Sequence, residues 1–226
     1  MLGGDGGLDA AQTSDAAQTS DAAQSPDATA LVDAAATGDA AIAGPCAGAA
    51  CRGAIVVSEI GVGRLVRIDD DYVEIYNRSA FDADVSGCVL RVDGALSATI
   101  PAGTTLPAHR YYLFGGAMYM RAPTADASYI DNVTPASWVA IDCGTTRLDL
   151  VGGAGAQTYE RNPISVAASS TGAYHRRASA TSTCAEITGT GSAAAAGNGY
   201  DTDDNETDFV VCGTQEPQSS QAPAEP

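Results

Sequence analysis

Apolar and polar side chains alternate along a series of short segments from Ala54 onward, and most of these segments end at glycine, asparagine or aspartate. In residues 71–77, Val73 and Ile75 would point to one face of an extended strand, and Tyr72 and Glu74 to the other. Comparable patterns predict strands at 55–60, 71–77, 88–92, 110–114, 138–141, 147–151, 157–161, 173–176 and 209–211. No amphipathic helix of about ten or more residues is predicted in this region, so the pattern favours an antiparallel sandwich or barrel.

The first 50 residues follow a different pattern. They contain neither arginine nor an aromatic residue, the segment AAQTSD at 10–15 repeats at 16–21, and an aspartate recurs every six residues from Asp9 to Asp39. Such spacing gives no apolar stripe on a helix, and the segment offers little apolar surface to bury. We therefore predict a disordered spacer at 1–50, one β-sandwich domain at 51–213 and a disordered tail at 214–226.

The net charge of −17 narrows the classes of partner. Binding to phosphate backbones needs clustered cations, and only Arg176 and Arg177 come close to a cluster. We expect a protein or a cell-envelope component as the partner, rather than a nucleic acid. No apolar segment is long enough to predict a transmembrane helix, and the oligomeric state stays open.

Six cysteines in a β-rich chain indicate disulfides and an oxidising compartment. A metal site is less favoured, because the chain has no C-x-x-C motif and its two histidines, His109 and His175, are not at ligand spacing to a cysteine pair. Spacing alone does not define the connectivity. Our preferred pair is Cys184–Cys212, which would close a long loop rich in Ala, Gly and Asp onto the last strand; Cys88–Cys143 and Cys46–Cys51 would then remain.

The N-terminus shows no export signal, since Met1–Asp5 has neither a basic start nor an apolar run. This conflicts with the interpretation of the cysteines. Our hypothesis is that the natural export signal is missing from this chain, and that the spacer resembles the stalk after the lipidated cysteine of bacterial lipoproteins. We therefore expect an extracellular or cell-surface protein.

Several segments in order resemble the lamin-tail domain of the kind found in exported bacterial proteins. They read IVVSEI at 55–60, DYVEIYNRS at 71–79, DVSGCVLRVDG at 84–94, IPAGTTLPAHRYYLFGG at 100–116, LDLVGGAGA at 148–156, TGAYHRRAS at 171–179 and DTDDNETDFV at 201–210. The resemblance covers about residues 54–212. Two departures are Cys88, where the family often has a core Trp, and an apparent insertion at 124–143.

This resemblance implies an all-β, immunoglobulin-like antiparallel sandwich with a non-catalytic role in protein or surface association. We therefore expect a surface-tethered or secreted binding or scaffolding module. The alternative is a Ca²⁺-stabilised adhesive or carbohydrate-binding sandwich domain.

One acidic segment is a candidate calcium site, formed by Asp201, Asp203, Asp204 and Asn205. Hard oxygen ligands at alternating positions suit Ca²⁺, but the segment lacks the glycine and the distant glutamate of an EF-hand loop. The favoured interpretation is a turn whose side chains bond nearby backbone N–H groups. We expect no cofactor, with calcium as the alternative; Asp69–Asp71 is a weaker candidate of the same kind.

No arrangement predicts catalysis. The chain contains no G-x-S-x-G, no HExxH and no phosphate-binding loop. Glu59 and Glu74 could form a carboxylate pair for glycoside chemistry, yet both lie in segments that carry the family resemblance, and we interpret them as hydrogen-bonding groups. We therefore expect a protein that is not an enzyme.

Overall fold

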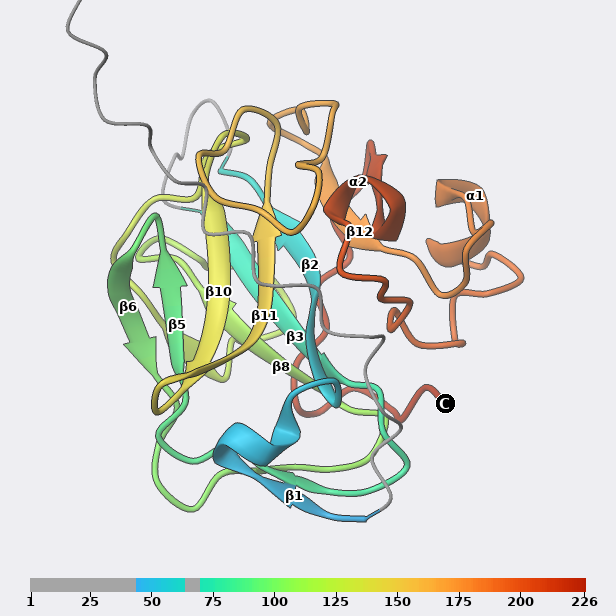
Figure 1. Ribbon diagram of the computed structural model, residues 1–226. Coiled ribbons are helices and arrows are strands. Elements are labelled where there is room, and N and C mark those ends of the chain that lie inside the picture. Colours follow the sequence, from blue (N-terminus) through green and yellow to red (C-terminus); the bar gives the residue numbers. More distant parts are fainter. Residues whose placement is uncertain (1–43, 64–69) are drawn as a thin grey trace, which may run out of the picture.

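The computed structural model describes residues 44–63 and 70–226, and these residues form an all-β sandwich (Figure 1). The predicted fold class is thereby confirmed. Most of the predicted spacer, 1–43, lies outside the described residues. Residues 44–50 are part of the folded domain, so its boundary lies before residue 51.

The larger sheet has six strands in the order β13-β12-β2-β3-β8-β9. All neighbours pair antiparallel except β8 and β9, which are parallel. Its strands are β2 (Ile55–Gly61), β3 (Tyr72–Asn77), β8 (Tyr111–Gly115), β9 (Ala127–Ser128), β12 (Ala173–Arg176) and β13 (Phe209–Cys212).

The second sheet has four antiparallel strands in the order β11-β10-β5-β6. They are β5 (Val89–Val92), β6 (Ala95–Thr99), β10 (Trp138–Cys143) and β11 (Thr146–Gly152). Strands β5 and β6 are joined by Asp93 and Gly94 with φ of 48° and 90°. Two successive positive φ angles suit the twist of a tight hairpin, for which the Asp-Gly dipeptide is favoured.

A small sheet closes one end of the sandwich. It pairs β1 (Cys46–Ala47) in parallel with β4 (Ala83–Asp84), and β4 antiparallel with β7 (Thr105–Leu106). The helices of the described residues are short: the 3₁₀ turn η1 (Gly48–Cys51), α1 (Cys184–Ile187) and α2 (Asn205–Asp208). None of them has the length and apolar character needed to cross a bilayer.

The core lies between the two large sheets. Val73, Ile75 and Phe114 from the six-stranded sheet and Leu90 and Ile141 from the four-stranded sheet belong to one buried cluster. The predicted alternation in β3 is thereby confirmed on its core side. Disulfides join Cys46 to Cys51, Cys88 to Cys143 and Cys184 to Cys212, which are the three predicted pairs.

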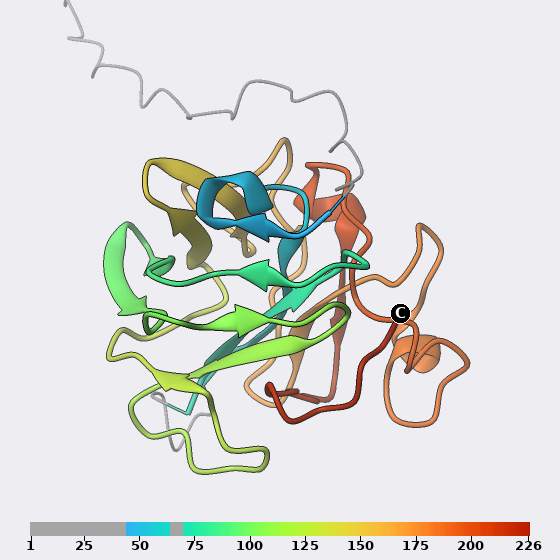
Figure 2. The same ribbon diagram turned by 90° about the horizontal axis from the view of Figure 1, so that it is seen from below.

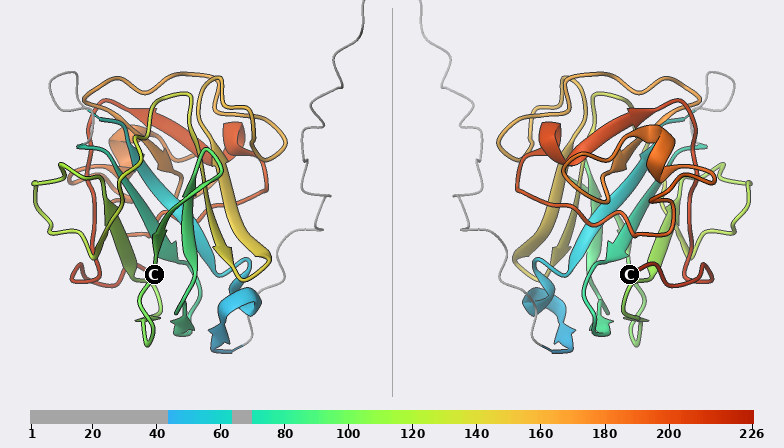
Figure 3. Two further views of the ribbon diagram at one scale, coloured as in Figure 1. Left: turned by 90° about the vertical axis from the view of Figure 1, so that its left-hand side faces the viewer. Right: turned by 90° about the vertical axis from the view of Figure 1, so that its right-hand side faces the viewer.

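The outer face of the six-stranded sheet is also buried, which the alternating pattern does not predict. Tyr72, Glu74 and Tyr76 point away from the core cluster, yet each is at most 2% exposed. In the right-hand view of Figure 3, orange and red segments lie in front of the strands, and Figure 2 shows the dark red chain end on the side away from the four-stranded sheet. These segments, 184–200 and 214–226, cover the face.

Two sequence predictions are wrong. Residues 157–161 form bends rather than a strand, because the chain turns there to bring Glu160 against Asn205. Residues 214–226 are not a disordered tail but lie against the outer face of the six-stranded sheet. Composition misled here, because this segment is held by polar contacts rather than by apolar side chains; we call it the strap.

Candidate functional site

Arg176 on β12 is the centre of a buried ionic cluster. Its guanidinium donates hydrogen bonds to Asp149 Oδ2 at 2.7 Å, to Asp201 Oδ1 at 2.8 Å and to the Val57 carbonyl at 2.7 Å. Asp208 lies 3.6 Å away, and the Arg176 side chain is fully buried. We call Arg176, Asp149, Glu160, Asp201 and Asp208 the Arg176 cluster. A buried arginine needs such carboxylates, because a charge without a partner is costly inside a protein.

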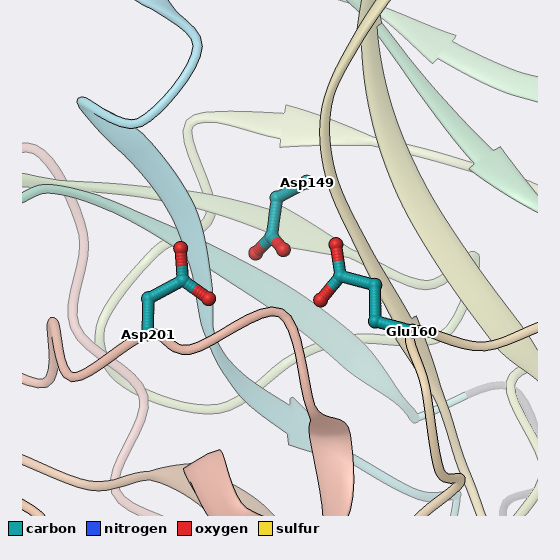
Figure 4. Close-up of side chains that lie close together, drawn as sticks. All are labelled: Asp149, Glu160 and Asp201. Carbon is teal, nitrogen blue, oxygen red and sulfur yellow. The ribbon is translucent and has the colours of Figure 1, made fainter. Parts of the chain in front are cut away.

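Three of these carboxylates could also hold a cation. Asp149, Glu160 and Asp201 each offer an oxygen within 4.8 Å of the others, and Figure 4 shows the three groups facing one another. Burial raises the pKa of Asp149 to about 7, although Arg176 opposes the shift. Burial and then the charge of Asp149 raise the pKa of Glu160 to about 10. Burial and the neighbouring carboxylates thus favour the neutral, protonated form of Glu160, which reduces the excess negative charge of the cluster.

The predicted calcium residues do not converge on one point. Asp201 joins the Arg176 cluster, and its carboxylate accepts a hydrogen bond from the backbone of Asp203. Asn205 Oδ1 instead accepts from the Gly152 and Glu160 backbones, at 2.8 and 3.1 Å. Asp204 is bonded to Asn162. Asp201 thus bonds a nearby backbone group, whereas Asn205 joins the turn before α2 to distant parts of the sandwich. Asp204 and Asn205 are buried, and Asp201 and Asp203 are half-buried.

A second buried acidic group lies on the outer face of the six-stranded sheet. Glu59 and Glu74 are direct cross-strand partners on β2 and β3, so the two carboxylates considered in the sequence analysis lie side by side. Glu59 accepts a hydrogen bond from the Tyr72 hydroxyl, and Glu74 accepts one from the Ser58 hydroxyl at 2.6 Å. His175 Nε2 lies 3.3 Å from Glu59 Oε1.

This group is enclosed rather than open to a substrate. Burial and then the charge of Glu59 raise the pKa of Glu74 well above its usual range. A cavity of about 180 Å³ remains beside the pair, and its walls include Glu59, Glu74 and His175 from the sheet together with Gln218 and Glu225 from the strap. The carboxylates therefore bind the chain's own groups.

The strap crosses the sheet and presents alternate backbone N–H groups to carboxylates. Glu216 N–H donates to Glu59 Oε1 at 3.0 Å, and Gln218 N–H donates to Glu74 Oε2. Ser220 N–H donates to Asp126 Oδ2 at 2.9 Å. Glu59, Glu74 and Asp126, which we call the carboxylate row, lie on β2, on β3 and just before β9. Extended chain places every second N–H on the same side, which accounts for the spacing.

The strap is fixed at its far end by tyrosines. The Tyr111 hydroxyl donates to Glu225 Oε2 at 2.6 Å, and the Tyr76 hydroxyl donates to the Glu225 carbonyl. Ala222 packs against the small apolar cluster of Val56, Tyr76 and Tyr111. Burial and then the charge of Glu225 raise the pKa of Tyr76 to about 12, so this hydroxyl remains a donor at neutral pH.

The loop between β8 and β10 carries exposed apolar side chains. Met118, Met120 and Ile130 are 44%, 76% and 86% exposed. They are three of the six large apolar residues that are exposed among the described residues, and all lie within 118–130. A hollow of about 520 Å³ lies beside Met120.

The remaining candidate residues have structural partners. Asp71 Oδ2 accepts hydrogen bonds from the Tyr129 hydroxyl at 2.7 Å and the Val133 backbone at 2.6 Å. Asp70 forms an ion pair with Arg121. Asp69 lies outside the described residues. His109 has φ of 58° and its Nδ1 lies 3.3 Å from the Tyr76 hydroxyl.

Sequence reasoning missed Arg176 as a buried centre and Asp126 as a contact of the strap. A signal existed for Arg176. It lies two residues after Tyr174 on a predicted strand, so both side chains point to the same face of the sheet, and the aromatic Tyr174 indicates that this face is buried. Asp126 has no such signal. No protein-family model matches this chain, and no curated protein matches its sequence. The lamin-tail resemblance therefore stays a prediction.

Proposed function

We propose that this chain is a non-catalytic, secreted or surface-tethered binding and scaffolding module of the lamin-tail type. The observation that carries the proposal is the exposed loop with Met118, Met120 and Ile130. Exposed apolar side chains concentrated in one loop are typical of a contact surface for another protein. The three disulfides support an oxidising compartment, because such bonds are rare where thiols are kept reduced.

The buried ionisable groups support a non-catalytic role. Asp149 and Asp201 are paired with Arg176, while Glu59 and Glu74 are covered by the strap. Catalysis would need such groups to converge on a cleft that a substrate can enter. In this chain they join segments that are distant in sequence, so we assign them to stability.

The test is capture of a partner from the envelope fraction of the source organism, with chemical cross-linking. The variant Met120→Asp/Ile130→Asp is compared with Leu96→Asp, which alters an exposed apolar residue (59% exposed) on β6 of the other sheet. We expect the double variant to lose the cross-linked partner, and Leu96→Asp to keep it. Equal capture by all three proteins, or no capture by the unaltered chain, would overturn the proposal.

One observation favours the calcium-stabilised alternative, namely the facing carboxylates of Asp149, Glu160 and Asp201. Against it, Arg176 already supplies positive charge to Asp149 and Asp201. We therefore expect millimolar Ca²⁺ to leave the melting temperature unchanged. A rise that is lost in Glu160→Gln would instead support a calcium-stabilised adhesive or carbohydrate-binding domain.

A further inference from the structure

The strap is bound through its backbone as well as through side chains such as those of Gln215 and Glu225. Its N–H groups at Glu216, Gln218 and Ser220 each bond to a different member of the carboxylate row. Proline, which lacks an N–H, occurs at position 217, between two of these donors. The carboxylate row thus recognises an extended peptide with free N–H groups at alternate positions.

The contact between the strap and the sheet is incomplete. The cavity of about 180 Å³ remains beneath it, and the buried Oε1 atom of Gln218 has no hydrogen-bond partner among the described residues. Ala222 is the strap residue that packs on an apolar cluster of the sheet. Buried polar atoms are nearly always paired, so a partnerless one marks a fit that is not optimal.

The strap also leaves the sandwich at a defined point. Cys212 is fixed by its disulfide to Cys184, whereas Gly213 and Thr214 are exposed, and a Cβ atom on Gly213 would meet open space. A change of backbone direction at Gly213 would therefore lift the strap and break the Gln215 hydrogen bonds to the Val62 and Gly172 carbonyls, while the disulfide stays in place.

We propose that the carboxylate row also binds the strap of a second copy of this chain, so that neighbouring molecules exchange residues 214–226. A second copy is the occupant because this segment is the one peptide that is seen to fit, including Ala222 on the apolar cluster and Glu225 on Tyr111. An identical segment exchanged between copies forms the same contacts in the partner molecule as it forms in its own molecule. The inference goes beyond the proposed function and does not involve the apolar loop.

The tethered strap competes with exchange. A segment joined by a short linker has an effective concentration in the ~1 mM range. Unaltered molecules in dilute solution therefore keep their own strap and remain monomeric. Exchange becomes favourable where copies are crowded, as on a surface, or where the strap of one copy is weakened.

Two variants separate the strap from its binding surface. Gln218→Pro/Ser220→Pro removes two N–H donors and leaves an unoccupied carboxylate row. Tyr111→Phe/Asp126→Ala removes two of the groups that hold the strap and weakens its hold; Asp126 also accepts a hydrogen bond from the Leu113 N–H, so folding of this variant is checked as well. The matched control for the first variant is Gln218→Ala/Ser220→Ala, which keeps both N–H groups. Each variant alone should sediment as a monomer of 22.7 kDa.

Mixing the proline variant with the Tyr111→Phe/Asp126→Ala variant should produce a heterodimer of twice that mass, detected by sedimentation velocity. The alanine control mixed with the same partner should stay monomeric, because it retains its own strap. A synthetic peptide of residues 213–226 should bind the proline variant about tenfold more tightly than the unaltered chain, because the tethered competitor is weakened.

A mixture that stays monomeric while both variants are folded would overturn the inference, as would a peptide that binds the two proteins equally. Near-UV circular dichroism monitors folding. If the double proline variant does not fold, Ser220→Pro alone replaces it. The Ala222 N–H donates to the Ser219 carbonyl and closes a turn, and Ser220 is the second residue of that turn, a position that favours proline. The variant Met120→Asp/Ile130→Asp should exchange straps normally, so failure of one proposal is distinguishable from failure of the other.

Discussion

Replacing Arg176 by methionine tests whether the buried cluster stabilises the sandwich. The substitution keeps an unbranched apolar side chain over Phe209 but removes the donors to Asp149, Asp201 and the Val57 carbonyl. Removing one partner of a buried ion pair typically costs about 3–5 kcal/mol, since the other charge stays buried without compensation. Asp201 keeps an ion pair with Arg78 at 3.2 Å, so we expect a loss in the middle of this range, about 4 kcal/mol at neutral pH.

The assay is urea denaturation followed by tryptophan fluorescence and circular dichroism, at about pH 7 and about pH 5. Arg176 lowers the pKa of Asp149, Asp201 and Asp208, so its removal raises their folded-state pKa values. Acids with raised pKa values favour the folded state as pH falls, so the deficit of the variant should shrink at about pH 5.

Arg177→Met is the matched control, because this neighbouring arginine donates to the Thr207 and Ser182 carbonyls and forms no part of the cluster. It should cost less than about 1.5 kcal/mol. A loss below about 1 kcal/mol for Arg176→Met, or a deficit that does not change with pH, would refute the reasoning.

Three further predictions concern single features. The pKa of Glu160 is raised from 4.5 to about 10, so the stability of the protein should fall as pH rises through this range. Urea midpoints at about pH 5, 7 and 9 measure this fall, and Glu160→Gln should make it smaller. Replacing Cys184 and Cys212 by serine opens a loop of 28 residues and should cost about 3.5 kcal/mol in the same assay; an unchanged midpoint would contradict this. Gly94→Ala should cost about 1–2 kcal/mol because φ at this position is 90°, although the new Cβ would lie no closer than 3.6 Å to Trp138. The control Gly213→Ala, at a position without a positive φ, should leave the melting temperature unchanged.

The strands could be predicted because their signals are local. Val73 and Ile75 on the core side of β3 follow from a period of two, and the hairpin after β5 follows from the Asp93-Gly94 dipeptide. The disulfides are the predicted ones: Cys184–Cys212 was preferred because it closes the long loop, and Cys88–Cys143 and Cys46–Cys51 were assigned to the cysteines that remained. These features depend on residues near one another or on a small set of partners.

The buried polar groups could not be predicted, because their partners are distant in sequence. Arg176 meets Asp149 across 27 residues and the Val57 carbonyl across 119. A glutamate such as Glu74, opposite the core face of a strand, ordinarily indicates solvent. Here it is buried because a segment 144 residues away covers it.

The strap shows why composition misjudged residues 214–226. Predictions of disorder weigh the apolar side chains that a segment can bury, and this segment offers little beyond Ala222. Its hold comes instead from hydrogen bonds, which join backbone N–H groups to the carboxylate row and the side chains of Gln215 and Glu225 to other parts of the sandwich. All these partners are distant in sequence from the strap. A segment that is held by polar contacts over a residual cavity and buries little apolar surface opens at a smaller free-energy cost than a core strand does. Because the strap buries little apolar surface, its position is hard to predict from the sequence, and the same property allows it to change partners.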